Sequence, residues 1–385
     1  MFRKTIFWLH LTLGVSIAVI VLIMAGTGVL LTYQKQMQSW ADMRGLNGTA
    51  PTQGATPLPT SVLLDRARAV KATTPSAIRW RAAADAPVEV VFGREGSLFL
   101  NAYTGTVLGS GSAGMHKFFR LVTDWHRWLG LKGAARERGR MIIGAANLGF
   151  LFLVLGGFYL WWPRNWTGAA FRNVLLFRRG LPSKARDFNW HNVIGIWSWV
   201  PLVIIVFSGV VISYPWAGSL VDRIAGTERP AAARSAAASA RAGAGGRVDL
   251  DGLVARAKQQ DREWRQISLD LAPAKNGNQA FTIDRGNGGQ PHKRAQLVLT
   301  PAGDVARWQP LSAESRARQA RSFLRFAHTG EIGGIAGQTI AGLVSAGVLV
   351  LVYTGFALAL RRFTAWRNRR GRPAAVARSP RATVG

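Results

Sequence analysis

Four long apolar runs restrict the fold of this chain more than any other feature of its sequence. The runs cover about residues 12–33, 141–162, 193–214 and 336–360, and none of them contains Asp, Glu, Lys or Arg. A helix needs roughly 20 apolar residues to cross about 30 Å of bilayer hydrocarbon, and uncharged runs of this length are typical of transmembrane helices. The sequence therefore predicts four transmembrane helices in a lipid bilayer.

The net charge of +30 raises the alternative of a nucleic-acid-binding protein. The basic residues are spread through loops around the apolar runs and form no compact basic domain, so no nucleic-acid partner is expected. Basic loops stay on the cytoplasmic side of a membrane, and both termini are therefore predicted to be cytoplasmic. The residues behind this prediction are Arg3 and Lys4 before the first run; Arg164, Arg172, Arg178, Arg179, Lys184 and Arg186 between the second and third; and Arg361, Arg362, Arg367, Arg369, Arg370 and Arg372 after the fourth.

The first and third apolar runs match each other without a gap. A signal peptide is the alternative for the first run, but that run is too long for one and has its match in mid-chain. The match predicts two repeats that run in the same direction. The aligned residues are His10 with His191, Gly14 with Gly195, Thr27-Gly28-Val29 with Ser208-Gly209-Val210, and Tyr33 with Tyr214.

Both halves contain the same order of predicted elements. A membrane helix leads to a small outer α+β domain, and a surface helix with a histidine precedes the returning membrane helix. The predicted fold is a mainly α membrane protein with four transmembrane helices as two parallel repeats. The segments are helix 1 in 1–33, the first outer domain and surface helix in 34–135, helix 2 in 136–164, a cytoplasmic loop in 165–188, helix 3 in 189–214, the second outer domain in 215–335 with a flexible linker in 227–247, helix 4 in 336–362, and a basic cytoplasmic tail in 363–385.

Four of the six histidines fall into two pairs. His10 and His191 are predicted at the cytoplasmic ends of helices 1 and 3, and His126 and His328 precede helices 2 and 4 on the outer side. Two imidazoles from facing helices suit the two axial positions of a haem iron. The chain has no cysteine, which excludes disulfides, thiolate metal sites, iron–sulfur clusters and covalently attached c-type haem. We therefore predict two non-covalent b-type haems with these four histidines as iron ligands.

Glycines near the histidines favour a flat ligand. Gly14 and Gly195 follow His10 and His191 by four residues, on the same helix face. Gly28 and Gly209 follow the same histidines by 18 residues, which is five turns at 3.6 residues per turn and about 27 Å along the helix. These glycines are predicted to give room for one haem at each end.

Three further residues near the outer pair are weaker candidates for the cofactor site. His116 could be a reserve ligand or a partner of a haem propionate, and Arg127 and Arg140 could pair with propionates. A solvated role fits each arginine equally well. His292 lies among polar residues and is expected to be exposed.

Each of these features also has an ordinary structural explanation. A histidine at a membrane edge is often a hydrogen-bonded interfacial residue, and glycines four residues from a neighbour are common in membrane helix packing. Two matched pairs favour haem over these explanations. Zinc would need further Cys, His or carboxylate ligands, which the apolar runs do not offer.

Several stretches resemble the PepSY-associated transmembrane family, the iron-regulated inner-membrane proteins of bacteria. The stretches on which the resemblance rests are 189–195 with 208–210, 125–130, 157–164 and, as the most specific, 328–338. The resemblance implies a bacterial inner membrane and two PepSY-like periplasmic domains. Because members include siderophore-iron reductases with two b-type haems, it also implies electron transfer to a periplasmic ferric siderophore. Pro301-Ala302-Gly303 stands where the first half has Tyr103-Thr104-Gly105, so these domains depart from the family pattern and docking alone is compatible with them.

Three functions compete at this point. The leading hypothesis is a di-haem inner-membrane oxidoreductase that reduces a ferric siderophore. The alternative is a membrane regulator or assembly partner with PepSY-like domains and no redox activity. A transporter is disfavoured because the four predicted helices show no charge and no break at mid-membrane. The electron donor is not identified by the sequence, and no glycine-rich dinucleotide loop is evident.

Overall fold

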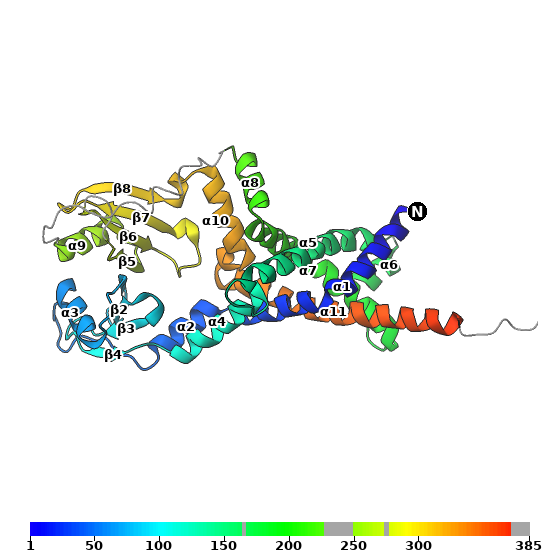
Figure 1. The fold of residues 1–385 in the computed structure, drawn as a ribbon, viewed down its shortest axis with the longest axis horizontal. Helices are drawn as coiled ribbons and strands as arrows, with labels where there is room; N and C mark the ends of the chain where they lie inside the picture. Colours follow the sequence, from blue (N-terminus) through cyan, green and yellow to red (C-terminus); the bar gives the residue numbers. More distant parts are fainter. Residues whose placement is uncertain (164–166, 227–248, 273–276, 371–385) are drawn as a thin grey trace, which may run out of the picture. The chain divides into compact units, whose positions relative to one another are not determined.

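The structure is a computed structural model that describes residues 1–163, 167–226, 249–272 and 277–370 (Figure 1). The predicted linker at 227–247 lies outside the described residues, as do Arg164, Arg372 and the end of the predicted basic tail. The chain divides into two compact units whose boundaries fall inside the long helices. The first unit comprises Met1–Gly26, Ala145–Val203 and Val344–Gly385, and the second comprises Thr27–Gly144 and Ile204–Leu343.

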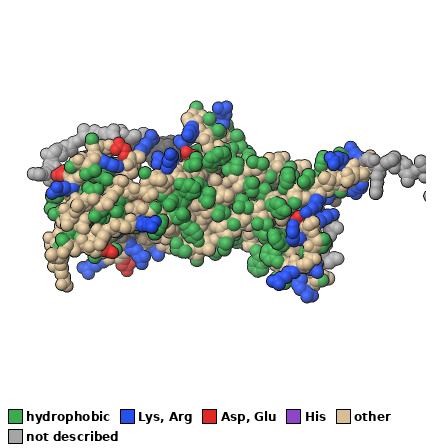
Figure 2. All heavy atoms as spheres, turned by 90° about the horizontal axis from the view of Figure 1, so that it is seen from below, with side chains coloured by type: hydrophobic (Ala, Val, Ile, Leu, Met, Phe, Trp, Pro, Cys, Tyr) green, Lys and Arg blue, Asp and Glu red, His purple; other side chains and the backbone are tan. Residues whose placement is uncertain are grey.

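Within the described residues, four helices are long and apolar enough to cross a membrane. They are α1 (Phe2–Leu31), α5 (Ala135–Trp161), α7 (Ser183–Ser213) and α11 (Gly334–Arg370). Their surfaces carry many exposed apolar side chains, such as Val19 at 69% and Leu343 at 68% exposed, and hydrophobic side chains cover much of the surface in Figure 2. A surface of this kind is stable only against an apolar surrounding, so the protein is a multi-pass membrane protein.

The first unit also contains α6 (Gly168–Leu175) and a buried ion pair. The Asp187 carboxylate on α7 is 0% exposed and accepts hydrogen bonds from Arg186 at 3.0 Å and from Arg361 on α11 at 2.7 Å. A buried carboxylate without such partners would be strongly unfavourable. The pair therefore fixes the beginning of α7 against α11.

The second unit contains an antiparallel sheet of eight strands. The two halves were expected to form separate small domains, but β1 pairs with β5 from Ala77 opposite Asp270 to Arg81 opposite Gln266. Four strands from each half thus share one sheet in the order β4-β3-β2-β1-β5-β6-β7-β8. The strands are β1 (Ala77–Arg81), β2 (Val88–Val91), β3 (Ser97–Leu100), β4 (Val107–Gly109), β5 (Gln266–Asp270), β6 (Gln279–Asp284), β7 (Arg294–Leu299) and β8 (Val305–Pro310).

The core of this sheet follows the alternation of its strands. In β1, Ile78 and Trp80 are buried while Ala77, Arg79 and Arg81 are only half-buried, because successive side chains point to opposite faces of a strand. Two helices, α3 (Thr60–Val70) and α9 (Leu250–Gln260), add buried side chains to the same core, including Leu63 and Leu253. Each half therefore supplies one helix and four strands to a single shared core.

The described residues of the second unit also form the shorter helices α2 (Gln34–Met43), α4 (Ala113–Trp128), α8 (Pro215–Ile224) and α10 (Arg316–His328). The α4 helix begins at Ser112, whose hydroxyl accepts a hydrogen bond from the Met115 backbone, and ends where Leu129 and Gly130 adopt positive φ angles of 53° and 72°. The α10 helix is fixed to α8 by an ion pair between Arg321 and Asp222. These ends place His126 and His328 in the last turns of α4 and α10.

Candidate functional site: two pairs of histidines

His126 and His328 lie next to each other in the second unit. Their ring centroids are 6.5 Å apart with an angle of 62° between the rings. The two residues are separated by 202 positions in the sequence, so the approach is made by the tertiary fold. The predicted outer pair is therefore close in space.

Both outer histidines contact a hydroxyl group through Nδ1. Thr27 Oγ1 lies 2.8 Å from His126 Nδ1, and Ser208 Oγ lies 3.2 Å from His328 Nδ1. Thr27 and Ser208 are aligned with each other in the sequence match between the first and third apolar runs. The same contact is thus made twice, by matched residues of the two halves.

The protonation of His328 follows from its second partner. His328 Nδ1 lies 2.8 Å from the carbonyl oxygen of Ile205, and a carbonyl can only accept. Nδ1 therefore carries the proton, which leaves the lone pair on Nε2 in the neutral ring. Burial lowers the pKa of His328, and the bond to the Ile205 carbonyl opposes this only in part. A neutral imidazole oriented through Nδ1–H is the usual form of a histidine that ligates a metal.

His10 and His191 lie in the first unit, close enough to interact electrostatically. Each imidazole packs against a glycine of the returning helix in its own half. A Cβ built on Gly157 of α5 would be 3.3 Å from His10 Cε1, and a Cβ built on Gly355 of α11 would be 3.3 Å from His191 Cε1. Any side chain at either glycine would press on the ring. Sequence reasoning included Gly157 in the stretch 157–164 but did not connect it, or Gly355, with the histidines, because both glycines are remote from them in the chain.

The two inner histidines differ in their Nδ1 atoms. The Thr354 hydroxyl donates to the Val350 carbonyl at 2.7 Å, so its oxygen accepts from His191 Nδ1, 3.0 Å away. His10 Nδ1 is buried and has no hydrogen-bond partner. The residue before Gly157 is Gly156, where the other half has Thr354 before Gly355. His10 thus lacks the hydroxyl that orients His191.

A buried nitrogen without a partner needs an explanation, since such atoms are rare in folded proteins. A hydroxyl such as the one that Thr354 supplies to His191 is missing at this nitrogen, and His10 is held instead by its packing against Gly157. Among the described residues, no group of three or more His, Asp or Glu side chains is placed to hold a metal ion. The residues present therefore fit haem better than zinc, because haem requires only two ligands from the protein.

The glycines singled out by the sequence are used mainly for packing. Built Cβ atoms on Gly14 and Gly195 would each lie 3.9 Å from a leucine, Leu153 on α5 and Leu351 on α11 respectively. These are ordinary contacts between the two membrane helices of one half. Gly28 and Gly209 follow Thr27 and Ser208 directly in the sequence, and their role as clearance for a cofactor remains a prediction.

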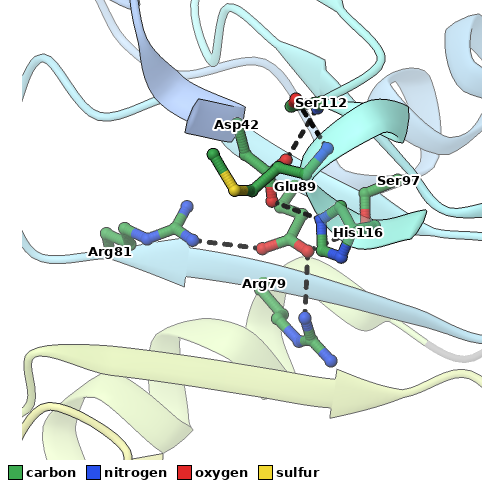
Figure 3. A network of polar contacts seen from close by, with 8 residues as sticks. Asp42, Arg79, Arg81, Glu89, Ser97, Ser112 and His116 are labelled. Atoms are coloured by element: carbon green, nitrogen blue, oxygen red, sulfur yellow. Dashed lines mark hydrogen bonds and ion pairs between the residues drawn. The ribbon is translucent and has the colours of Figure 1, made fainter. Parts of the chain in front are cut away.

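The weaker candidates have other partners. His116 Nε2 lies 2.8 Å from Asp42 Oδ2 at the start of α4 (Figure 3), about 15 Å of helix before His126. Arg140 pairs with Glu137 at 2.6 Å, and Arg127 stacks on Trp128 with 4.7 Å to the ring centroid. The contacts described for these three side chains do not include the histidine pairs. His292 is exposed, as predicted.

A second polar network lies beside Asp42 and His116 in Figure 3. Glu89 on β2 is 7% exposed and binds Arg79 at 2.9 Å and Arg81 at 3.2 Å on β1. Ser97 on β3 donates to the same carboxylate at 2.8 Å. Both carboxylate oxygens of Glu89 have partners, and the network therefore links β1, β2 and β3.

The most specific sequence stretch, 328–338, has a structural basis beyond His328. Gly330 and Gly337 pass so closely that a Cβ on either would collide with the backbone of the other. The Gln338 side chain is 2% exposed and donates to the Thr32 carbonyl at 2.7 Å while it accepts from Gln36 at 2.7 Å. These contacts fix the beginning of α11 against α1 and α2 within the second unit.

The four apolar helices of the described residues define a multi-pass membrane protein with two histidine pairs. Comparison with known families identifies the family to which it belongs. The family described as "PepSY-associated TM region" matches residues 7–362. The chain belongs to this family, in agreement with the resemblance found in its sequence. No curated protein matches the chain.

Proposed function

We propose that this protein is a di-haem oxidoreductase of the bacterial inner membrane that passes electrons to a periplasmic ferric siderophore. His126 and His328 would hold one b-type haem, and His10 and His191 the other. Bound haem would supply a one-electron carrier at each position, and two histidine ligands leave no open iron position for substrate. Reduction of iron(III) to iron(II) weakens its binding to hard oxygen ligands, so the siderophore would release its iron.

The observation that supports this proposal most is the duplicated contact between a hydroxyl and an imidazole. Thr27 with His126 and Ser208 with His328 hold matched atoms at 2.8 and 3.2 Å. Both contacts occupy Nδ1 and leave Nε2 for a ligand. Simple burial of a histidine does not require the same arrangement in both halves.

We further propose that the two halves are parallel repeats. Three sets of matched contacts favour this organisation: the hydroxyls with the outer histidines, Gly157 and Gly355 with the inner histidines, and Gly14 and Gly195 with leucines of the returning helices. In this proposal the basic segments and both termini are cytoplasmic, and the eight-stranded sheet lies in the periplasm. The electron donor is a separate cytoplasmic or membrane-soluble molecule.

The proposal is tested by an absorption spectrum of the purified full-length protein before and after dithionite. We expect a b-type spectrum that is reducible, with two haems per chain. His292→Ala is the matched control, because His292 is exposed and outside both pairs; it should leave the spectrum unchanged. Colourless protein from haem-replete cells would contradict the proposal and favour a regulator or assembly partner without redox activity.

A further inference from the structure

The first unit contains an open pocket that the proposed haem sites do not use. It has a volume of about 590 Å³ and lies where the segment between α6 and α7 faces α7 and α11. This volume is within the range of pockets for small molecules. The residues that line it are Phe177, Arg178, Arg179, Gly180, Leu181, Arg186, Trp190, Ile194 and Val350.

One side of the pocket is strongly cationic. Arg178, Arg179 and Arg186 contribute three positive charges. Asp187, which follows Arg186 in the chain, is 0% exposed and already shared by Arg186 and Arg361. Arg178 is bound to the neutral side chain of Asn173 at 2.8 Å, and the Arg179 side chain is exposed. The positive charge is thus only partly compensated by the protein itself.

The other side of the pocket is apolar and extends into the membrane-spanning part. Phe177 and Trp190 stand edge to face with 6.4 Å between their ring centroids. Ile194 and Val350 belong to α7 and α11, inside the apolar runs that the sequence predicts to cross the membrane. A ligand for this pocket must therefore combine an anionic group with an apolar chain.

The arginine segment is held in place without a ligand. The Asn189 side chain is 4% exposed, donates to the carbonyls of Asn173 at 2.8 Å and Leu176 at 3.0 Å, and accepts from the Arg178 backbone at 3.1 Å. One amide thus connects the segment to α7. The pocket is preformed, which reduces the entropy cost of binding.

We propose that this pocket binds one anionic phospholipid, with the phosphate at Arg178 and Arg179 and an acyl chain along Leu181, Ile194 and Val350. A phospholipid is the ligand in which a phosphate stays at the membrane surface while an apolar chain enters the hydrocarbon. Basic pockets between transmembrane helices on the cytoplasmic side are typical sites for anionic headgroups, and this is the side to which the basic segments are assigned here. The site is independent of haem.

The test uses the delipidated full-length protein in detergent and native mass spectrometry. The protein is titrated with phosphatidylglycerol and with phosphatidylcholine of identical acyl chains. We expect one phosphatidylglycerol to bind more tightly than phosphatidylcholine. Arg179→Gln should weaken phosphatidylglycerol binding about fivefold, and Arg178→Gln with Arg179→Gln about 25-fold, since each surface arginine contributes roughly that factor with anionic lipid.

The matched control is Arg367→Gln with Arg369→Gln, which removes two charges at the end of α11 outside the pocket. This control should leave phosphatidylglycerol binding unchanged. Equal binding of the two lipids, equal weakening by the control, or displacement of the lipid by inorganic phosphate would each overturn the proposal. The single variant Arg179→Gln keeps the test decisive if the double variant does not fold, because it preserves the bond between Arg178 and Asn173.

Discussion

Each of the two histidine pairs takes one histidine from each half of the chain, but the hydrogen bonds at Nδ1 differ between the pairs. In the second unit, His126 and His328 both have a hydroxyl at Nδ1. In the first unit, His191 has the Thr354 hydroxyl, whereas the buried His10 Nδ1 has no partner. The difference comes from one position, where Gly156 stands in place of a threonine. Contacts around the histidines thus recur in both halves, while the hydrogen bond at Nδ1 is missing for His10.

This comparison suggests that the two sites hold their ligands with different strength. Partners that orient a metal-bound histidine are worth about 10- to 100-fold in metal affinity. In the outer pair both histidines have a hydroxyl partner at Nδ1, whereas in the inner pair only His191 has one. We therefore expect the outer haem to be retained better than the inner haem when the protein is diluted or treated with apomyoglobin as a haem acceptor.

The largest effect is expected from filling the inner clearance. Gly157→Leu or Gly355→Leu should abolish the inner haem and leave the outer haem, because even a Cβ would lie 3.3 Å from the imidazole. The overpacking should also cost about 1–3 kcal/mol in unfolding free energy. Haem content and dithionite difference spectra measure the loss.

The control for these variants is Gly168→Leu on α6, where a Cβ would meet no atom within 4 Å. This variant should keep both haems. If the glycine variants at 157 and 355 also keep both, the imidazoles that pack against these glycines do not hold the inner haem.

A smaller effect is expected from removing the outer hydroxyls. Thr27→Val should lower outer haem affinity by about 10- to 100-fold through loss of the bond to His126 Nδ1. Ser208→Ala should act less strongly, because the Ile205 carbonyl still accepts from His328 Nδ1 at 2.8 Å. Competition with apomyoglobin gives the affinities. Binding of the inner haem should be unaffected. An equal loss of haem from both sites would show that Thr27 and Ser208 do not act specifically on the outer pair.

The smallest expected effect is an increase in the affinity for the inner haem. Gly156 precedes Gly157 as Thr354 precedes Gly355, so Gly156→Ser is designed to bring a hydroxyl to His10 Nδ1; its Cβ would make only ordinary contacts, the nearest at 3.6 Å from Ile6. One added hydrogen bond contributes about 0.5–1.5 kcal/mol, so inner haem should bind about twofold to tenfold tighter. The rate of haem transfer to apomyoglobin is measured for Gly156→Ser and for Thr354→Val, which removes the existing bond to His191. The two variants compare the contributions of a hydroxyl at His10 and at His191. A slower loss in Thr354→Val would show that these hydroxyls do not orient the ligands.

The membrane helices could be predicted from the sequence because uncharged apolar runs define α1, α5, α7 and α11 by composition alone. The outer pair could be proposed because the predicted topology assigned His126 and His328 to the same side of the membrane, although their approach depends on the tertiary fold. The pairing of β1 with β5 was not predictable, because Ala77 and Asp270 are far apart in the chain and alternation within a strand does not name its partner.

The fine structure of the sites was missed for the same reason. Gly157 and Gly355 lie on different helices from the histidines they contact, and Thr354 resembles any other residue of an apolar run. The alignment did pair Thr27 with Ser208, and that match was the available signal for the outer hydroxyls. Matched polar residues in matched apolar segments were therefore more informative than glycine spacing.

The most direct test of the account is the number of haems per chain in histidine variants. The wild-type protein should contain two haems by pyridine haemochrome assay, His328→Ala and His10→Ala one each, and the double variant none. Unchanged haem content in His328→Ala and His10→Ala, in folded protein, would contradict the assignment of these imidazoles as iron ligands.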